Sequence, residues 1–308
     1  MQFSLSSEQQ ALLDAVQPLL AKHREPPQAE RIQRSIYDRG LDRALDEGGF
    51  YDLVREADYG PLEGALLVDA IGRLPVVVES AASILVGPQL LPAGARRPIT
   101  LVSGGLDKPQ RFLPVARVAL FETDGDVLAI DVSPEDVETV ESLFAYPMGR
   151  FRTPPDLAKA QRLGPEAVDK LRQWWRVALA VEVGAAMASA VEFTVDYVKN
   201  RRMFNRTLGS FQAVQHRLAE CHQIARATRY MALRAAWSGQ PMDACLAAAY
   251  AQKHIDKVRF DLHQFNGGMG MSNEHLLHFW TYRFRALESE MGGPQSNAAA
   301  AAREAYAA

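Results

Sequence analysis

The stretch Gln264-Phe-Asn-Gly-Gly-Met-Gly270 places three glycines within four positions, between two helical patterns. Glycines interrupt a helix and let a backbone approach a ligand closely. The next helix is expected to begin near Asn273, so its free N–H groups could face an anion such as a pyrophosphate. Taken alone, a plain turn between two helices explains the stretch more simply. It is not a dinucleotide-binding fingerprint, because no strand precedes it.

A second segment, Arg201-Arg-Met-Phe204-Asn205 followed by Phe211-Gln212, comes directly after a long helical pattern. Its guanidinium groups could bind a phosphate, its aromatic rings could stack on a ligand ring, and its amide could hydrogen-bond the polar edge of a ligand. The simpler interpretation is that cations end a helix because they complement its dipole. Each of the two segments is a weak signal by itself.

Around these segments the chain is expected to be mostly α, in three regions: 1–91 helical, 92–155 a small β region, and 156–308 a helical bundle. Ser6 and Gln9 form a capping box that opens the first helix. Asp124-Gly125 lies between two apolar runs and predicts a hairpin turn. Four long patterns with short connections favour an antiparallel four-helix bundle. They cover 166–200, 210–237, 242–264 and 273–290, and an Ala-rich tail from 296 is expected to be peripheral.

The composition of the chain argues against several classes of function. Lys plus Arg total 34 and Asp plus Glu total 37, a net charge of −3 that argues against nucleic-acid binding. No apolar run reaches the ~20 residues that span a bilayer, and the N-terminus lacks the features of a signal peptide. Cys221 and Cys245 are expected to be buried thiols in a reducing cytoplasm. The histidines show no metal-binding spacing, so no metal and no membrane are expected.

Taken together, the two segments are a stronger signal. R-x-x-F-x…F-Q followed by Q-x-x-G-G-x-G resembles the C-terminal domain of acyl-CoA dehydrogenases. The resemblance extends to the N-terminal half of the chain at Phe3, Ser6, Glu8 and Gln9, at Glu47-Gly48-Gly49 and at Ile71-Gly72-Arg73.

The resemblance implies FAD as cofactor. In that family the two segments clamp the ADP half of an FAD that the neighbouring subunit mainly holds. Carried over, Arg201 and Gln212 contact the pyrophosphate–adenosine portion and Phe204 packs beside it. Gln264, Gly267 and Gly268 close over it. Asn205 stands where the family usually has Gly, and Asn tolerates left-handed backbone angles best after Gly.

The catalytic base is where this chain departs from the family. These enzymes oxidise the Cα–Cβ bond of an acyl thioester after a carboxylate removes the α-proton. Counted without gaps, Met291 occupies the usual Glu position, and a one-residue slip would make Glu290 a weak candidate. On a continuing helix Glu290 would project about 100° away, whereas Gly292 and Gly293 could end the helix early and turn Glu290 inward. At the alternative position on the long helix stands Trp175, which is expected to fill the pocket rather than accept a proton.

The middle region is shorter than the family's and lacks both its Ser/Thr flavin strand and its G-S-D phrase. The chain therefore resembles the small subunits of heteromeric bacterial acyl-CoA dehydrogenases of steroid side-chain degradation. That resemblance implies a paralogous partner subunit in an α2β2 complex, an acyl-CoA substrate and electron-transfer flavoprotein as acceptor. Two alternatives stay open: a non-catalytic structural partner, and a flavin oxidase or monooxygenase of the same fold.

Overall fold

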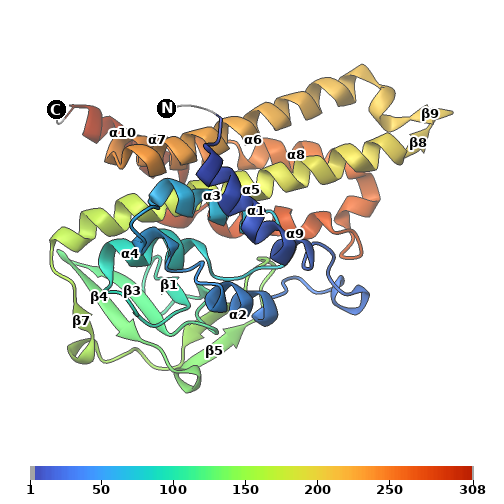
Figure 1. The fold of residues 1–308 in the computed structure, drawn as a ribbon. Helices are drawn as coiled ribbons and strands as arrows, with labels where there is room; N and C mark the ends of the chain where they lie inside the picture. The colour runs from blue at the N-terminus through green and yellow to red at the C-terminus, as the bar shows by residue number, and fades with distance from the viewer. Residues whose placement is uncertain (1–3, 307–308) are drawn as a thin grey trace.

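The computed structural model describes residues 4–306, so Phe3 lies outside it. A bundle of long helices carries the N-terminal helices on one side and the β region below them (Figure 1). The predicted capping box opens the first helix: Gln9 N–H donates to Ser6 Oγ at 3.2 Å, and Ser6 N–H donates to Gln9 Oε1 at 3.0 Å. The N-terminal helices are α1 Ser7–Ala21, α2 Arg39–Glu47, α3 Pro61–Gly72 and α4 Gly87–Leu90.

The β region contains two small sheets, with strand orders β1-β3-β4-β7 and β2-β6-β5. The predicted hairpin is present: β3 and β4 pair antiparallel, and Gly125 adopts a φ of 80° in the turn. The division of the chain into three regions, with boundaries after residues 91 and 155, stays a proposal. Strand β7 of the first sheet lies beyond the second boundary. The strands are β1 Ile99–Leu101, β2 Gln110–Arg111, β3 Val118–Thr123, β4 Asp126–Asp131, β5 Val137–Val140, β6 Met148–Phe151 and β7 Gln161–Arg162.

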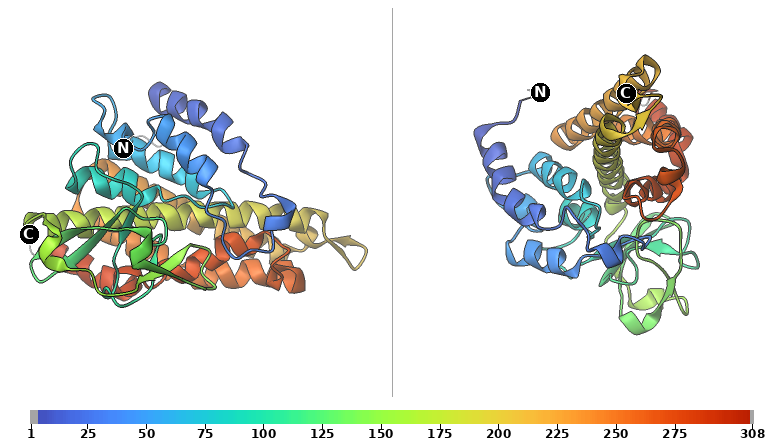
Figure 2. Two further views of the ribbon diagram at one scale, coloured as in Figure 1. Left: turned by 90° about the horizontal axis from the view of Figure 1, so that it is seen from below. Right: turned by 90° about the vertical axis from the view of Figure 1, so that its right-hand side faces the viewer.

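Helix α5, Glu166–Asn200, is the centre of the C-terminal bundle (Figures 1 and 2). Its most apolar stretch is long enough to cross a membrane, but 78% of that stretch is buried inside the protein, as in a core helix. At Gly184 the backbone of α6 passes so close that a Cβ atom would lie 3.3 Å from the Arg229 nitrogen. The other helices are α6 Gln212–Ser238, α7 Pro241–Lys253, α8 Ile255–Asn266, α9 Leu277–Leu287 and α10 Gly293–Tyr306.

Three predictions about the bundle were wrong. The single helix expected over 242–264 is interrupted at His254, which ends α7 and precedes α8. The helix expected over 273–290 is shorter and stops at Leu287. The tail is not peripheral, because α10 packs against α7 and buries Ala300 and Ala301 with Cys245. Alanine side chains allow two helices to approach closely, which a hydrophobicity pattern does not reveal.

A buried arginine joins the N-terminal helices to the bundle. Arg283 on α9 is 3% exposed, and burial lowers the pKa of its guanidinium. It donates hydrogen bonds of 2.6–3.1 Å to the carbonyl groups of Gly72, Leu74, Pro75 and Val76, just after α3. One side chain thus satisfies four backbone acceptors that would otherwise be unpaired where α3 ends.

Replacing Arg283 by Met should destabilise the fold by about 3 kcal/mol or more, because buried acceptors without a donor cost about 1–3 kcal/mol each. Chemical denaturation monitored by circular dichroism would measure the change. Arg285→Met is the matched control, since Arg285 is exposed on the same helix; it should change stability by no more than about 0.5 kcal/mol. Equal effects of the two substitutions would contradict the anchoring role.

Candidate functional site

The chain turns Glu290 into the interior immediately after α9. Helix α9 ends at Leu287, and Met291 has a left-handed φ of 54°. Gly292 and Gly293 follow with φ values of 81° and 75°. The Glu290 residue is only 8% exposed. Of the two courses left open for Glu290, the chain takes the inward one, because α9 ends early and the residue no longer lies on a continuous α-helix.

Both oxygens of the Glu290 carboxylate accept hydrogen bonds. Arg111 on β2 donates from Nε to Oε1 at 2.5 Å and from Nη2 to Oε2 at 3.3 Å. The Trp175 indole N–H on α5 donates to Oε2 at 3.0 Å. Trp175 is buried, as expected, and its indole N–H also orients the carboxylate of Glu290.

A second carboxylate holds the other side of the same guanidinium. Glu182 lies two helical turns after Trp175, so both side chains share one face of α5. It accepts two parallel hydrogen bonds of 3.0 Å from Arg111. Burial lowers the pKa of Arg111, but the attraction of Glu182 and Glu290 outweighs it and raises the pKa well above its ordinary value. Arg111 is therefore a permanently charged centre held by two acids.

An open cavity of about 470 Å³ lies beside this cluster. It is bounded by the loop that leads into β2, by the chain between β5 and β6, and by the end of α9 with Glu290. Arg111 and Glu290 both line it, with Lys108, Ser142 and Phe144 among the remaining residues. The cavity is large enough for a small organic molecule.

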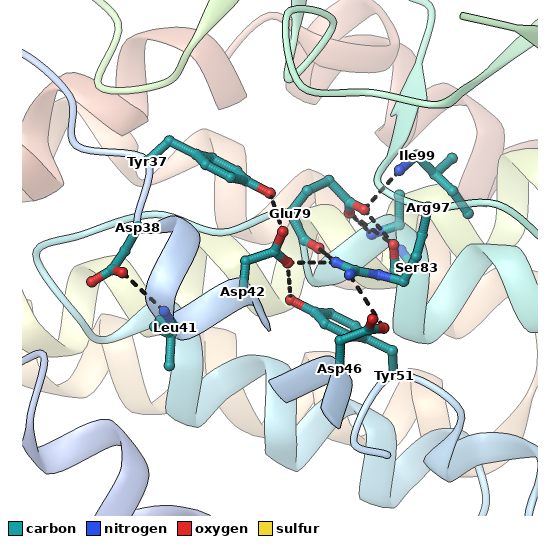
Figure 3. Close-up of polar contacts among 11 residues, drawn as sticks. Tyr37, Asp38, Leu41, Asp42, Asp46, Tyr51, Glu79, Ser83, Arg97 and Ile99 are labelled. Carbon is teal, nitrogen blue, oxygen red and sulfur yellow. Dashed lines mark hydrogen bonds and ion pairs between the residues drawn. The ribbon is translucent and has the colours of Figure 1, made fainter. Parts of the chain in front are cut away.

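Behind the cluster, a much smaller cavity of about 20 Å³ is lined by Glu79, Arg111, Trp175 and Glu182. This volume has room for about one water molecule. The Glu79 carboxylate is buried and accepts hydrogen bonds from Ser83 and from the Ile99 N–H (Figure 3). Burial raises the pKa of Glu79, and the Ser83 hydrogen bond offsets part of that shift. Two carboxylates and a guanidinium thus share this small cavity with apolar side chains, and an acyl chain does not fit in it.

The residues expected to clamp FAD all lie on the surface. Arg201 ends α5, and Phe204 and Asn205 form the tip of a hairpin between β8 Arg202–Met203 and β9 Arg206–Thr207. Phe204 is 83% exposed, and Asn205 has the left-handed φ, 63°, expected of it. The exposed Gln212 begins α6.

The second expected segment lies toward the same end of the bundle. Asn266, at the end of α8, donates to Thr194 near the end of α5 at 2.9 Å. Gln264, Gly267 and Gly268 are exposed there. Figure 1 shows the β8–β9 hairpin projecting beyond this end. Next to the segment lies an open cavity of about 600 Å³, lined by Gln264, Gly267, Phe260, His263, Tyr282 and Arg285 among others.

Sequence reasoning missed Arg111 altogether. Its position on a two-residue strand gives no local signal, and its partners Glu182 and Glu290 are 71 and 179 residues away. A signal did exist at Glu182, a charged residue within the long apolar pattern of α5. A carboxylate on a core-facing position predicts a buried cationic partner, but the pattern could not identify that partner.

Comparison with known proteins agrees with this architecture. Residues 164–304 match the family described as acyl-CoA dehydrogenase, C-terminal domain. The chain is 24% identical to acyl-CoA dehydrogenase IpdE2 of Mycolicibacterium smegmatis, over 94% of this chain and 96% of that protein. It is 25% identical to acyl-CoA dehydrogenase IpdE2 of Mycobacterium tuberculosis, over 94% of each.

Solved structures share the fold over the whole chain. The ChsE4-ChsE5 complex of Mycobacterium tuberculosis matches with a TM-score of 0.81 at 20% identity, covering 100% of both chains. A variant of the Tcur3481-Tcur3483 steroid acyl-CoA dehydrogenase matches with a TM-score of 0.81 at 22% identity, covering 99% of both. The C-terminal bundle of this protein is therefore an acyl-CoA dehydrogenase C-terminal domain, and the whole chain is similar to the two acyl-CoA dehydrogenases IpdE2 and shares the fold of the solved structures named above.

Proposed function

We propose that this protein is a subunit of an FAD-dependent acyl-CoA dehydrogenase and that it contributes the ADP clamp rather than the catalytic base. The observation that carries the proposal is the set of hydrogen bonds that the Glu290 carboxylate already accepts. Arg111 and Trp175 donate three hydrogen bonds to its two oxygens. The clamp residues, by contrast, are exposed and accessible to a neighbouring subunit.

The contacts of Glu290 oppose a role as base. A general base must reach the proton that it removes, with a free lone pair directed at it. Three of about four lone-pair positions of this carboxylate are already used. Freeing Glu290 would also deprive the buried Arg111 of one partner, and breaking a buried pair costs about 3–5 kcal/mol. We infer that Glu290 serves mainly to hold Arg111.

The clamp residues suit the ADP half of FAD, whose bound flavin supplies a hydride acceptor. Arg201 has no ion-pair partner among residues 4–306, so its guanidinium is available to a phosphate. Phe204 offers an exposed ring, while Gln212 and Gln264 offer amides. The glycines at 267 and 268 have open space at the Cβ position, which lets a ligand approach the backbone closely.

The remaining parts of the proposal concern the complex. We infer that the chain assembles with a paralogous partner subunit in an α2β2 complex and acts in the cytoplasm. We further infer that the substrate is the acyl-CoA thioester of a steroid side chain and that electron-transfer flavoprotein is the electron acceptor. Support comes from the fold shared with the ChsE4-ChsE5 complex and with a steroid acyl-CoA dehydrogenase. A structural partner with no part in binding ligands is the second candidate. The cavity of about 20 Å³ at Trp175 favours it, since no acyl chain fits there.

Glu290→Gln should leave the turnover of the assembled complex nearly unchanged, because the amide retains an oxygen for Trp175 and Glu182 still holds Arg111. Steady-state kinetics with an acyl-CoA substrate would measure it. Glu182→Gln is the matched control, since it removes the same charge from the same guanidinium. A loss above about a hundredfold in Glu290→Gln alone, within the 10²–10⁴ range of general-base contributions, would make Glu290 the base.

Arg201→Ala should weaken FAD retention by the complex roughly ten- to a hundredfold, as expected for losing a charge-assisted hydrogen bond of about 1.5–3 kcal/mol. Gln212→Ala should act in the same direction but less strongly. Flavin absorbance after dialysis would report both. Lys199→Ala is the control, since Lys199 lies in the last turn of α5 and pairs with Asp196 at 3.3 Å. Unchanged flavin content in Arg201→Ala would rule out the clamp.

Expressed without a partner, the chain should bind FAD weakly or not at all, because its β region is short and its clamp acts on a neighbour's cofactor. An absorbance spectrum of the purified protein and the mass of the species in solution would test this. Co-expression with a paralogous subunit should then yield a yellow complex. A homomer with one tightly bound FAD per chain would contradict the proposal.

A further inference from the structure

A groove of about 490 Å³ separates α1 from the helical bundle. Its walls come from α1, α3, α5 and α6, with Trp280 of α9 also lining it. Figure 2 shows α1 set apart from α5, with α3 between them. None of its lining residues belongs to the Glu290 cluster or to the expected clamp, so the groove is separate from the proposed function.

The floor of the groove is apolar. Leu20, Leu66, Leu74 and Trp280 are each less than 9% exposed and come from different parts of the chain. Phe193 on α5 is half-buried and packs against Trp280, with ring centroids 5.6 Å apart. Such a floor excludes water and favours an apolar ligand body.

Guanidinium groups line the groove above this floor. Asp69 is buried and faces two of them: Arg229 Nε lies 2.9 Å from its carboxylate, and Arg73 Nε lies 3.5 Å away. Arg24, in the turn that follows α1, donates to Gln17 at 2.8 Å and has no ion-pair partner among the described residues. The buried Asp69 therefore pairs with two of these three arginines, the one that follows α3 and the one on α6.

Two further acids line the groove, but both are solvated. Arg73 Nη1 reaches Glu192 at 3.1 Å, and the Glu192 side chain is 62% exposed. Asp196 is 76% exposed and pairs with Lys199 at 3.3 Å. Solvent screens exposed charges far more than buried ones. The lining carries as many acids as arginines, but the exposed Arg24 has no acid partner in the described part of the chain, and Arg229 hydrogen-bonds Asp69 through Nε.

We propose that this groove binds a small apolar organic acid, with its carboxylate facing Arg24 and Arg229 and its apolar body on Leu66, Phe193 and Trp280. The volume suits a small molecule, whose pockets typically measure about 300–1,000 Å³. Two turns of a docked helix, about 10 Å wide and 11 Å long, occupy more space than the groove has. Guanidinium groups match a carboxylate through paired hydrogen bonds.

Isothermal titration of the full-length protein with decanoate should show saturable binding, and uncharged decanol should bind roughly tenfold more weakly or not at all. Decyl phosphate tests the head group, and binding tighter than that of decanoate would overturn the assignment to a carboxylate. Arg24→Gln and Arg229→Gln should each weaken decanoate binding several-fold. Arg226→Gln on α6 is the control, since Arg226 does not line the groove, and it should leave binding unchanged.

Arg24 is exposed in the turn after α1, so its substitution tests the site even if Arg229→Gln disturbs folding through Asp69. Trp280→Phe should preserve binding while removing a ligand-induced change in tryptophan fluorescence. Equal affinity for decanol and decanoate would overturn the proposal. So would decanoate binding that both arginine substitutions leave unchanged, because the acid would then bind elsewhere.

Discussion

The contact between Arg111 and its two carboxylates is the constraint on which the rest of the site depends. A buried guanidinium is stable only if acids compensate its charge. Glu182 on α5 and Glu290 after α9 do so, with hydrogen bonds of 2.5–3.3 Å. Strand β2, the central helix and the C-terminal segment are thereby held together at one point. Once Arg111 enters the interior, Glu290 has to turn inward.

The residues that hold the Arg111 cluster together are different from those proposed to bind a cofactor. Trp175 donates to Glu290 within a polar cluster around Arg111, and both residues are less than 9% exposed. The groups suited to a cofactor lie instead on the surface, toward the end of the bundle where α5 and α8 finish. Under the proposed function, the chain would complete a neighbour's site without having a complete site of its own.

Arginines also connect the other layers of the molecule. Arg283 links α9 to the end of α3 through four carbonyl groups. Arg97, ahead of β1, lies over the Tyr51 ring at 3.3 Å and pairs with Asp42 at 2.6 Å (Figure 3). Its Nη2 also donates to the backbone carbonyl of Glu79. In each case one long side chain satisfies acceptors from several segments, so the helices and the small sheets depend on one another.

The sequence by itself determined those structural features that depend on residues close together in the chain. The capping box at Ser6, the hairpin at Gly125 and the left-handed Asn205 depend on interactions a few positions apart, and the structure confirms all three. The packing of α10 on α7 depends on a partner elsewhere in the chain, whereas the early end of α9 lies next to the left-handed Met291, Gly292 and Gly293. The Glu290 cluster shows this most clearly. Arg111 precedes Glu290 by 179 residues, and only the folded chain brings them within 2.5 Å.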